Sequence, residues 1–259
     1  MRVLGIDTAT RFVGVALLDT AHSGWWLQVA SLGEQRGEVL TAVVERALDE
    51  NGWIPEHLDG IAVAAGPGSY TGLRVGLAVA KTLAWAWEVP LAVVDTLQAQ
   101  ALGAAWAAPL VVAALDAGHG EVFAGVFRVG LSRTAEEGTA SAARVLSPPA
   151  GPLTLHAVLE PQPIAIRELA RVLAQQHEAW GGGCVAACGD GCRRHRPSLE
   201  AVPGLCWVWV PEEAELTRPS AVARLGAERL AAGEADDPVT VEARYLKATE
   251  AERRWLRKS

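Results

Sequence analysis

The stretch VLGID (residues 3–7) is a short apolar run that ends in an aspartate, and a return strand follows it after a brief turn. The same arrangement recurs at VAALD (residues 112–116). A second feature repeats in the same order, because VAAGPG (63–68) and VAACGDG (185–191) both pair a strand with a Gly-x-Gly turn. Two matches in one order indicate an internal duplication. We therefore predict an α/β protein with two similar lobes.

The spacing of apolar residues outlines the elements of these lobes. Short apolar runs predict strands, and three- and four-residue spacing predicts helices, in the order β-β-β-α-β-α-β-α over the first hundred residues. We predict a first lobe at 1–105, a second at 106–246 and a charged tail at 247–259. The last predicted helix, 219–232, is free to pack onto the first lobe, and residues 132–163 are predicted to form a surface loop.

Composition limits the classes of function. Half of the 259 residues are apolar and 20% are charged, which is typical of a folded globular protein. Thirty acidic and 23 basic residues give a formal net charge of −7, the opposite of what a protein that grips nucleic acid needs. Any role in RNA chemistry is therefore expected to run through a partner. The longest charge-free run, 96–115, contains polar residues and a proline, so we expect no membrane span.

The sequence also suggests a location in the cell. No basic-then-apolar leader is visible at the first residues, and the four cysteines are expected to be reduced thiols in a cytoplasm. Cys184, Cys188 and Cys192 have the wrong spacing for a zinc hairpin. We interpret them as small buried apolar side chains.

The stretch GPGSYTGLRVG (66–76) lies between a predicted strand and a predicted helix, and it resembles the signature of the TsaB (YeaZ) family. LGIDTAT (4–10), LDAGHGEVFA (115–124) and GDG (189–191) resemble further stretches of that family. The resemblance spans roughly residues 1–250. It implies two lobes of the actin-like ATPase, or ribonuclease H-like, fold, each a mixed sheet flanked by helices.

The same resemblance implies a function without an active site. Members are regarded as scaffolds or activators in the synthesis of N6-threonylcarbamoyladenosine (t6A) in tRNA. They bind the catalytic subunit TsaD, which transfers threonylcarbamoyl to tRNA adenosine, and the ATPase TsaE joins the pair. The tRNA would be met only indirectly, and the resemblance leaves monomer and homodimer open for the isolated chain. The alternatives are an ATP-binding enzyme of the actin-like fold and an M22-like metallopeptidase.

Two loops lie where actin-like ATPases bind phosphate, and we interpret both as vestigial. Working loops of this kind use glycine so that backbone N–H groups approach the phosphate, whereas DTAT (7–10) carries side chains there. The turn at 66–69 could hold an anion at a helix N-terminus, or could serve only to pack that helix closely on its strand. No cofactor is expected, although residual nucleotide binding stays open. The residues of the two loops are Asp7, Thr8, Thr10, Gly66, Gly68 and Ser69.

Resemblance also bears on metal binding. TsaD holds its metal with two histidines four residues apart, and the stretch VDTLQAQ (94–100) occupies the corresponding place. Thr96 and Gln100 stand where the two imidazoles would be, and neither replaces imidazole or carboxylate as a ligand. We expect no metal and no catalytic residue.

The helix predicted at 71–87 is apolar almost all round, so it needs cover on more than one side. Its two interior charges, Arg74 and Lys81, are seven residues apart and therefore share a face. Together with the preceding helix it could supply half of a four-helix bundle, and the family resemblance implies pairing with TsaD through these two helices. The predicted interface residues are Val39, Val43, Arg74, Val75, Leu77 and Lys81.

Overall fold

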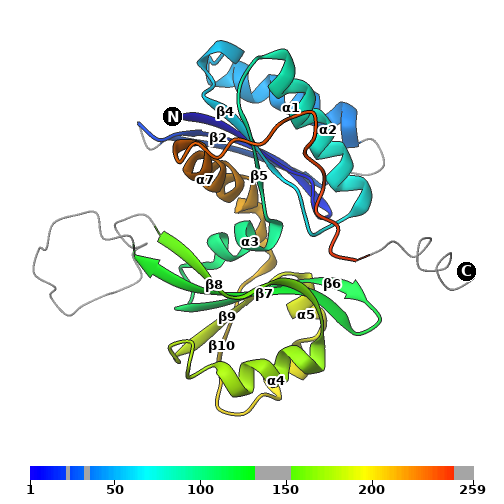
Figure 1. Cartoon of the computed structure of the whole chain (residues 1–259), viewed down its shortest axis with the longest axis vertical. Helices are drawn as coiled ribbons and strands as arrows, with labels where there is room; N and C mark the ends of the chain where they lie inside the picture. Colours follow the sequence, from blue (N-terminus) through cyan, green and yellow to red (C-terminus); the bar gives the residue numbers. More distant parts are fainter. Residues whose placement is uncertain (22–23, 32–35, 132–152, 248–259) are drawn as a thin grey trace, which may run out of the picture. The chain divides into compact units, whose positions relative to one another are not determined.

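A computed structural model describes residues 1–21, 24–31, 36–131 and 153–247 (Figure 1). Its internal contacts divide the chain into two compact units, Met1–Ala99 with Glu215–Ser259, and Gln100–Ala214. The chain from Glu215 onward, which includes the helix expected to be free to pack onto the first lobe, groups with the first unit. The predicted tail lies outside the described residues, apart from Lys247.

The first unit is a five-stranded mixed sheet with helices on both faces (Figure 1). Strands β3-β2-β1 are antiparallel neighbours, and β4 and β5 extend the sheet in parallel from β1. Helices α1 and α2 cover one face and α7 covers the other. The elements are β1 (Arg2–Asp7), β2 (Phe12–Asp19), β3 (Gly24–Ser31), α1 (Arg36–Glu50), η1 (Pro55–His57), β4 (Gly60–Ala64), α2 (Tyr70–Ala86), β5 (Leu91–Val94), η2 (Glu212–Thr217, at the boundary) and α7 (Arg218–Ala231).

The second unit repeats this topology. Its sheet has the order β10-β9-β6-β7-β8, with β6, β7 and β8 antiparallel and β9 and β10 parallel to β6. Read from β8, this is the order and the strand direction of the first unit, which confirms the duplication. Helix α3 (Thr96–Ala104) begins in one unit and ends in the other. The remaining elements are β6 (Leu110–Gly118), β7 (Glu121–Leu131), β8 (Leu153–Ala165), α4 (Ile166–Gln176), β9 (Cys184–Cys188), α5 (Asp190–Arg194), α6 (Arg196–Glu200) and β10 (Cys206–Trp209).

Strand β8 corrects the predicted surface loop. Residues 153–163 are part of this strand, whose pairing with β7 shifts register twice. These irregularities and two prolines hide the alternation by which a strand is recognised in sequence. Residues 132–152, the rest of the predicted loop, lie outside the described residues.

Helix α7 packs closely on the first sheet because a glycine lies on each side of the contact, one in β1 and one in α7. A Cβ on Gly5 of β1 would stand 2.6 Å from the carbonyl oxygen of Pro219, and a Cβ on Gly226 of α7 would overlap the side chain of Ala62. The close approach brings the start of α7 to the end of β1, where the candidate site lies.

The cysteines differ from the sequence prediction. Cys184 and Cys206 form a disulfide between directly paired positions of β9 and β10, with their Cα atoms 4.5 Å apart. The prediction of four reduced thiols is therefore wrong for these two. Cys188 and Cys192 are buried free thiols, as the packing interpretation expects. Within the described ranges, no helix is both long enough and apolar enough to cross a membrane.

Candidate functional site

Asp7, at the end of β1, is held by two partners inside the first unit. Its side chain accepts a hydrogen bond from the backbone N–H of Ala9 at 2.9 Å, which stabilises the turn between β1 and β2. Its other oxygen pairs with Nε of Arg218 at 2.5 Å, and both side chains are at most 2% exposed. Sequence analysis missed Arg218, which lies 211 residues away in the chain. The buried guanidinium of Arg218 is therefore paired with the Asp7 carboxylate, which a nucleotide site would need unpaired.

The threonines of the same loop fill the space beside Asp7. Thr8 is fully buried, and its hydroxyl donates to the carbonyl of Gly72 at 2.7 Å. A Cβ on Gly76 would overlap that hydroxyl, so α2 is in direct contact with Thr8. Thr10 accepts a hydrogen bond from Nη2 of Arg218 at 2.5 Å. The loop is thus closed by its own side chains.

Two backbone donors at the turn before α2 are engaged within the first unit. The N–H of Ser69 donates to the carbonyl of Ala9 at 2.6 Å, and a Cβ on Gly68 would overlap that carbonyl. The hydroxyl of Ser69 accepts from the N–H of Gly72 at 3.2 Å, so Ser69 is the N-cap of α2. Gly66 has a φ of +122°, which favours glycine. The close-packing role of the two glycines therefore accounts for the turn.

The second unit repeats the neutralised aspartate. Asp116 lies near the end of β6, as Asp7 lies at the end of β1, and it pairs with Nη1 of Arg194 at 2.9 Å. Its backbone N–H donates to Asp190 at 3.0 Å. Each repeat thus pairs its strand-end aspartate with an arginine of the same unit.

Thr96 and Gln100, for which the family resemblance implies the positions of two histidine ligands in TsaD, lie on α3. Both are buried, at 0% and 3% exposed. Within the described ranges, the hydroxyl of Thr96 and the amide group of Gln100 have no hydrogen-bond partner. A neutral hydroxyl and a neutral carboxamide do not fit a metal site that requires imidazole or carboxylate donors. Among the described residues, no three His, Cys, Asp or Glu side chains are grouped to hold a metal ion.

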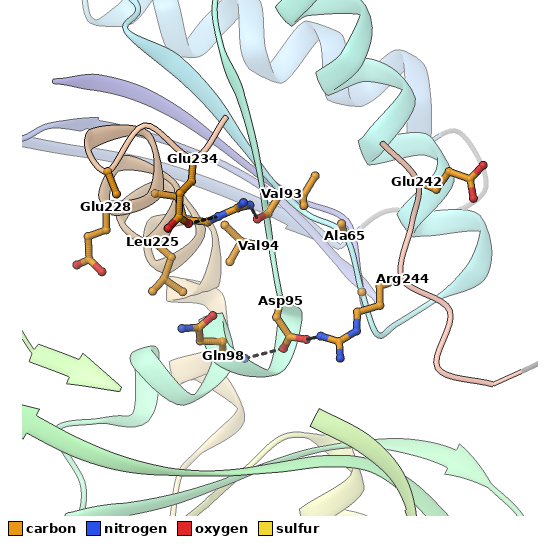
Figure 2. Close-up of a pocket in the computed structure, with 13 residues that line it drawn as sticks. Ala65, Val93, Val94, Asp95, Gln98, Leu225, Glu228, Glu234, Glu242 and Arg244 are labelled. Carbon is orange, nitrogen blue, oxygen red and sulfur yellow. Dashed lines mark hydrogen bonds and ion pairs between the residues drawn. The ribbon is translucent and has the colours of Figure 1, made fainter. Parts of the chain in front are cut away.

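A cavity of about 410 Å³ lies in the first unit along the edge of β5 (Figure 2). It is bordered by α7 and by residues 236–245, which we call the C-terminal segment. Asp95 and Arg244 point toward one another there and pair at 3.2 Å. Arg229 donates to the carbonyl of Val93 and pairs with Asp236. Four carboxylates and these two arginines line the cavity, so an anionic ligand such as a nucleotide would meet net negative charge.

Helix α2 presents an exposed face on the side away from the sheet. Trp85 is 75% exposed, and Ala78 and Thr82 precede it at helical spacing with their side chains in solvent. Val75 is half-buried on the same stripe. The exposed Trp85 ring leaves a large apolar side chain in solvent on this face of α2. Trp85 is absent from the predicted interface residues, although a tryptophan on a helix that is apolar almost all round was a signal available in the sequence.

The six predicted interface residues fall into three environments. Val43 and Leu77 are buried in the core of the first unit, whereas Val39 and Val75 lie partly buried at its surface. Arg74 and Lys81 do share a face, and the C-terminal segment contacts both. Lys81 donates to the carbonyls of Val239 and Val241, and Arg74 donates to the hydroxyl of Tyr245.

The chain is similar to known proteins in both sequence and fold. Residues 33–179 match the family model described as "TsaD: tRNA N6-adenosine threonylcarbamoyltransferase". The chain is similar to the tRNA threonylcarbamoyladenosine biosynthesis protein TsaB of Bacillus subtilis, with 28% identity over 99% of this chain and 98% of that protein. It is 35% identical to Escherichia coli TsaB over 48% of this chain and 53% of that protein. The fold is similar to YeaZ from Pseudomonas aeruginosa, with a TM-score of 0.64 and 23% identity over 95% of this chain and 99% of that chain.

Proposed function

The chain belongs to the TsaD family as the matching model defines it, and within it to the TsaB (YeaZ) branch; we propose that it is the non-catalytic partner of a TsaD protein in t6A synthesis. In this proposal it binds TsaD through α1 and α2, TsaE joins the complex, and tRNA is contacted through TsaD. The chain itself carries out no chemistry.

The observation that carries the proposal is the exposed face of α2. Trp85, Thr82 and Ala78 form a stripe that the first unit leaves in solvent. A large aromatic anchor surrounded by small residues suits close packing of a partner helix, and tryptophan is enriched among the residues that dominate binding energy. Val39 of α1 and Val75 of α2 are partly buried, and their exposed parts would add apolar contacts to the same partner.

The interior of the first unit supports the non-catalytic part of the proposal. A nucleotide enzyme of this fold would need an unoccupied strand-end carboxylate and a loop open to phosphate. Asp7 is instead paired with buried Arg218, and Thr8 packs under α2. The alternative of a metallopeptidase would need donor side chains at positions 96 and 100, which hold threonine and glutamine.

The experiment mixes the purified chain with its cognate TsaD protein and measures complex formation by size-exclusion chromatography with light scattering. The wild-type chain should co-elute with TsaD. Trp85→Asp should weaken the complex by at least about 30-fold, since removal of an interface anchor typically costs about 2 kcal/mol or more. Leu77→Asp is unsuitable because Leu77 lies in the core.

Trp106→Asp is the matched control. Trp106 is also an exposed tryptophan, at 56%, but it belongs to the second unit, whereas α2 belongs to the first. This variant should bind TsaD like the wild type. Normal binding by Trp85→Asp, or equal losses in both variants, would contradict the proposed surface. A Trp85-dependent self-association that persists in the presence of TsaD would identify the face as a homodimer contact instead.

A further inference from the structure

The C-terminal segment 236–245 is bound along one side of α2. Lys81 of α2 donates to the carbonyl oxygens of Val239 at 3.2 Å and Val241 at 2.9 Å. Val241 and Ala243 pack against the core that α2 covers. The backbone N–H of Arg244 donates to the carbonyl of Ala65, the residue after β4, at 2.7 Å. The segment therefore belongs to the folded first unit and ends beside the start of α2.

This arrangement brings Tyr245 to Tyr70 and Arg74, which we name the Tyr–Arg–Tyr cluster. The guanidinium carbon of Arg74 lies 4.0 Å from the ring centre of Tyr70 and 5.9 Å from that of Tyr245. The two ring centres are 5.2 Å apart. Nε of Arg74 donates to the hydroxyl of Tyr245 at 3.0 Å, and this hydrogen bond raises the pKa of Arg74. The guanidinium is thus held by contacts on its face and along one edge.

The cluster is nevertheless open to solvent. Tyr70 and Tyr245 are 42% and 43% exposed, and Arg74 is exposed as well. The hydrogen bond to Tyr245 uses Nε, so it does not engage Nη1 or Nη2 of the exposed guanidinium. A guanidinium already fixed by aromatic rings loses less conformational entropy when it binds a carboxylate through two parallel hydrogen bonds. Tyrosine and arginine are also the residue types enriched where interfaces bind tightly.

The cluster continues the exposed stripe of α2. Arg74, Ala78 and Thr82 are each four residues apart, and Trp85 follows on the same side of the helix. A partner helix lying on the stripe would reach Arg74 at the N-terminal end of α2. Lys81, the other cation of this helix, points to the C-terminal segment and is engaged there.

We propose that the Tyr–Arg–Tyr cluster binds an acidic side chain of the TsaD partner, and that the C-terminal segment is part of the docking surface because Tyr245 holds Arg74 in place. This inference rests on the proposed function. A protein carboxylate is favoured over an RNA phosphate, because RNA binding relies on several clustered cations and this cluster offers one guanidinium on a chain of net charge −7.

The test measures the affinity of the full-length chain for TsaD by titration calorimetry, for wild type, Arg74→Ala, Tyr245→Ala and the double variant. Arg74→Ala should weaken binding about tenfold, and Tyr245→Ala by a similar factor. The double variant should lose no more than Arg74→Ala alone, because Tyr245 acts through Arg74. Arg171→Ala, which removes an exposed arginine from α4 of the second unit, is the control and should bind normally.

Salt dependence gives a second measurement. Affinity should fall with added salt in the wild type and less steeply in Arg74→Ala, since the variant lacks the ion pair. The inference is overturned if both single variants bind within about twofold of wild type while Trp85→Asp does not bind. It is also overturned if the variants weaken only the binding of tRNA to the complex, which would assign the cluster to RNA. Normal binding of TsaD by Trp85→Asp would contradict the proposed function itself.

Discussion

Replacing Arg218 by methionine tests whether the Asp7 loop is closed by an internal ion pair. Arg218 is 1% exposed, and it contacts Asp7 and Thr10 at 2.5 Å and Glu215 at 3.7 Å. Methionine keeps much of the length of the side chain but removes the charge and its hydrogen bonds. Asp7 would then be a buried carboxylate whose remaining described partner is the N–H of Ala9.

The size of the effect follows from this burial. Removing one member of a buried ion pair typically costs about 3–5 kcal/mol, because the other charge stays desolvated and unpaired. For a protein of this size such a loss corresponds to a drop in melting temperature of roughly 6–20 °C. Asp7→Asn combined with Arg218→Met removes both charges of the Asp7–Arg218 pair, keeps an acceptor for the N–H of Ala9 and leaves Glu215 as it is in Arg218→Met alone. The double variant should therefore be more stable than Arg218→Met alone.

The assay is urea unfolding followed by circular dichroism, with calorimetry to locate the affected transition. Arg218→Leu, which removes the same charge in a shorter side chain, checks that the loss stems from the charge and not from the shape of methionine. The reasoning is refuted if Arg218→Met lies within about 1 kcal/mol of wild type. It is also refuted if the double variant is less stable than Arg218→Met, since the orphaned carboxylate would then not be the cause.

Three further predictions concern the disulfide, the C-terminal segment and nucleotide binding. Thiol titration of the unfolded, unreduced chain should find two free thiols, and a count of four would contradict the disulfide. Cys206→Ser should lower the free energy of unfolding by about 3 kcal/mol, which is the chain-entropy estimate for a separation of 22 residues. The pKa of Asp237 is lowered, first by the N–H of Val239 and then by the hydroxyl of Thr240, so its stabilising effect is complete above the usual aspartate pKa and is lost as pH falls below about 4. The difference in melting temperature between wild type and Asp237→Asn should therefore be larger at neutral pH than in acid, and an equal difference at both would be evidence against this role. Titration calorimetry of the isolated chain with ATP and magnesium should show no binding in the micromolar range, and a micromolar dissociation constant would restore the ATP-binding alternative.

Local patterns in the sequence were sufficient for most of the fold. The repeat of VLGID as VAALD indicated a duplication, and the two sheets have the same order and strand direction. Strand β8 was not predicted, because its bulges and prolines break the alternation of side chains that identifies a strand in sequence.

The contacts that shape the candidate site depend on residues far apart in the chain, so no local pattern reports them. Arg218 reaches Asp7 across 211 residues, and Tyr245 reaches Arg74 across 171. The assignment of residues after 214 to the first unit has the same origin. Cys206 likewise pairs with Cys184 only once β9 and β10 lie side by side, which cysteine spacing alone does not reveal.

The most direct test of a helical docking surface in place of an active site is t6A formation in a reconstituted reaction. The reaction contains TsaD, TsaE, tRNA, threonylcarbamoyl adenylate and this chain, and the modified nucleoside is quantified by mass spectrometry. We predict that omission of the chain or Trp85→Asp abolishes product, whereas Thr10→Ala, which alters the Asp7 loop and leaves α2 intact, retains it. Full activity of Trp85→Asp together with loss of activity in a folded Thr10→Ala variant would contradict the account, because function would then reside in the loop.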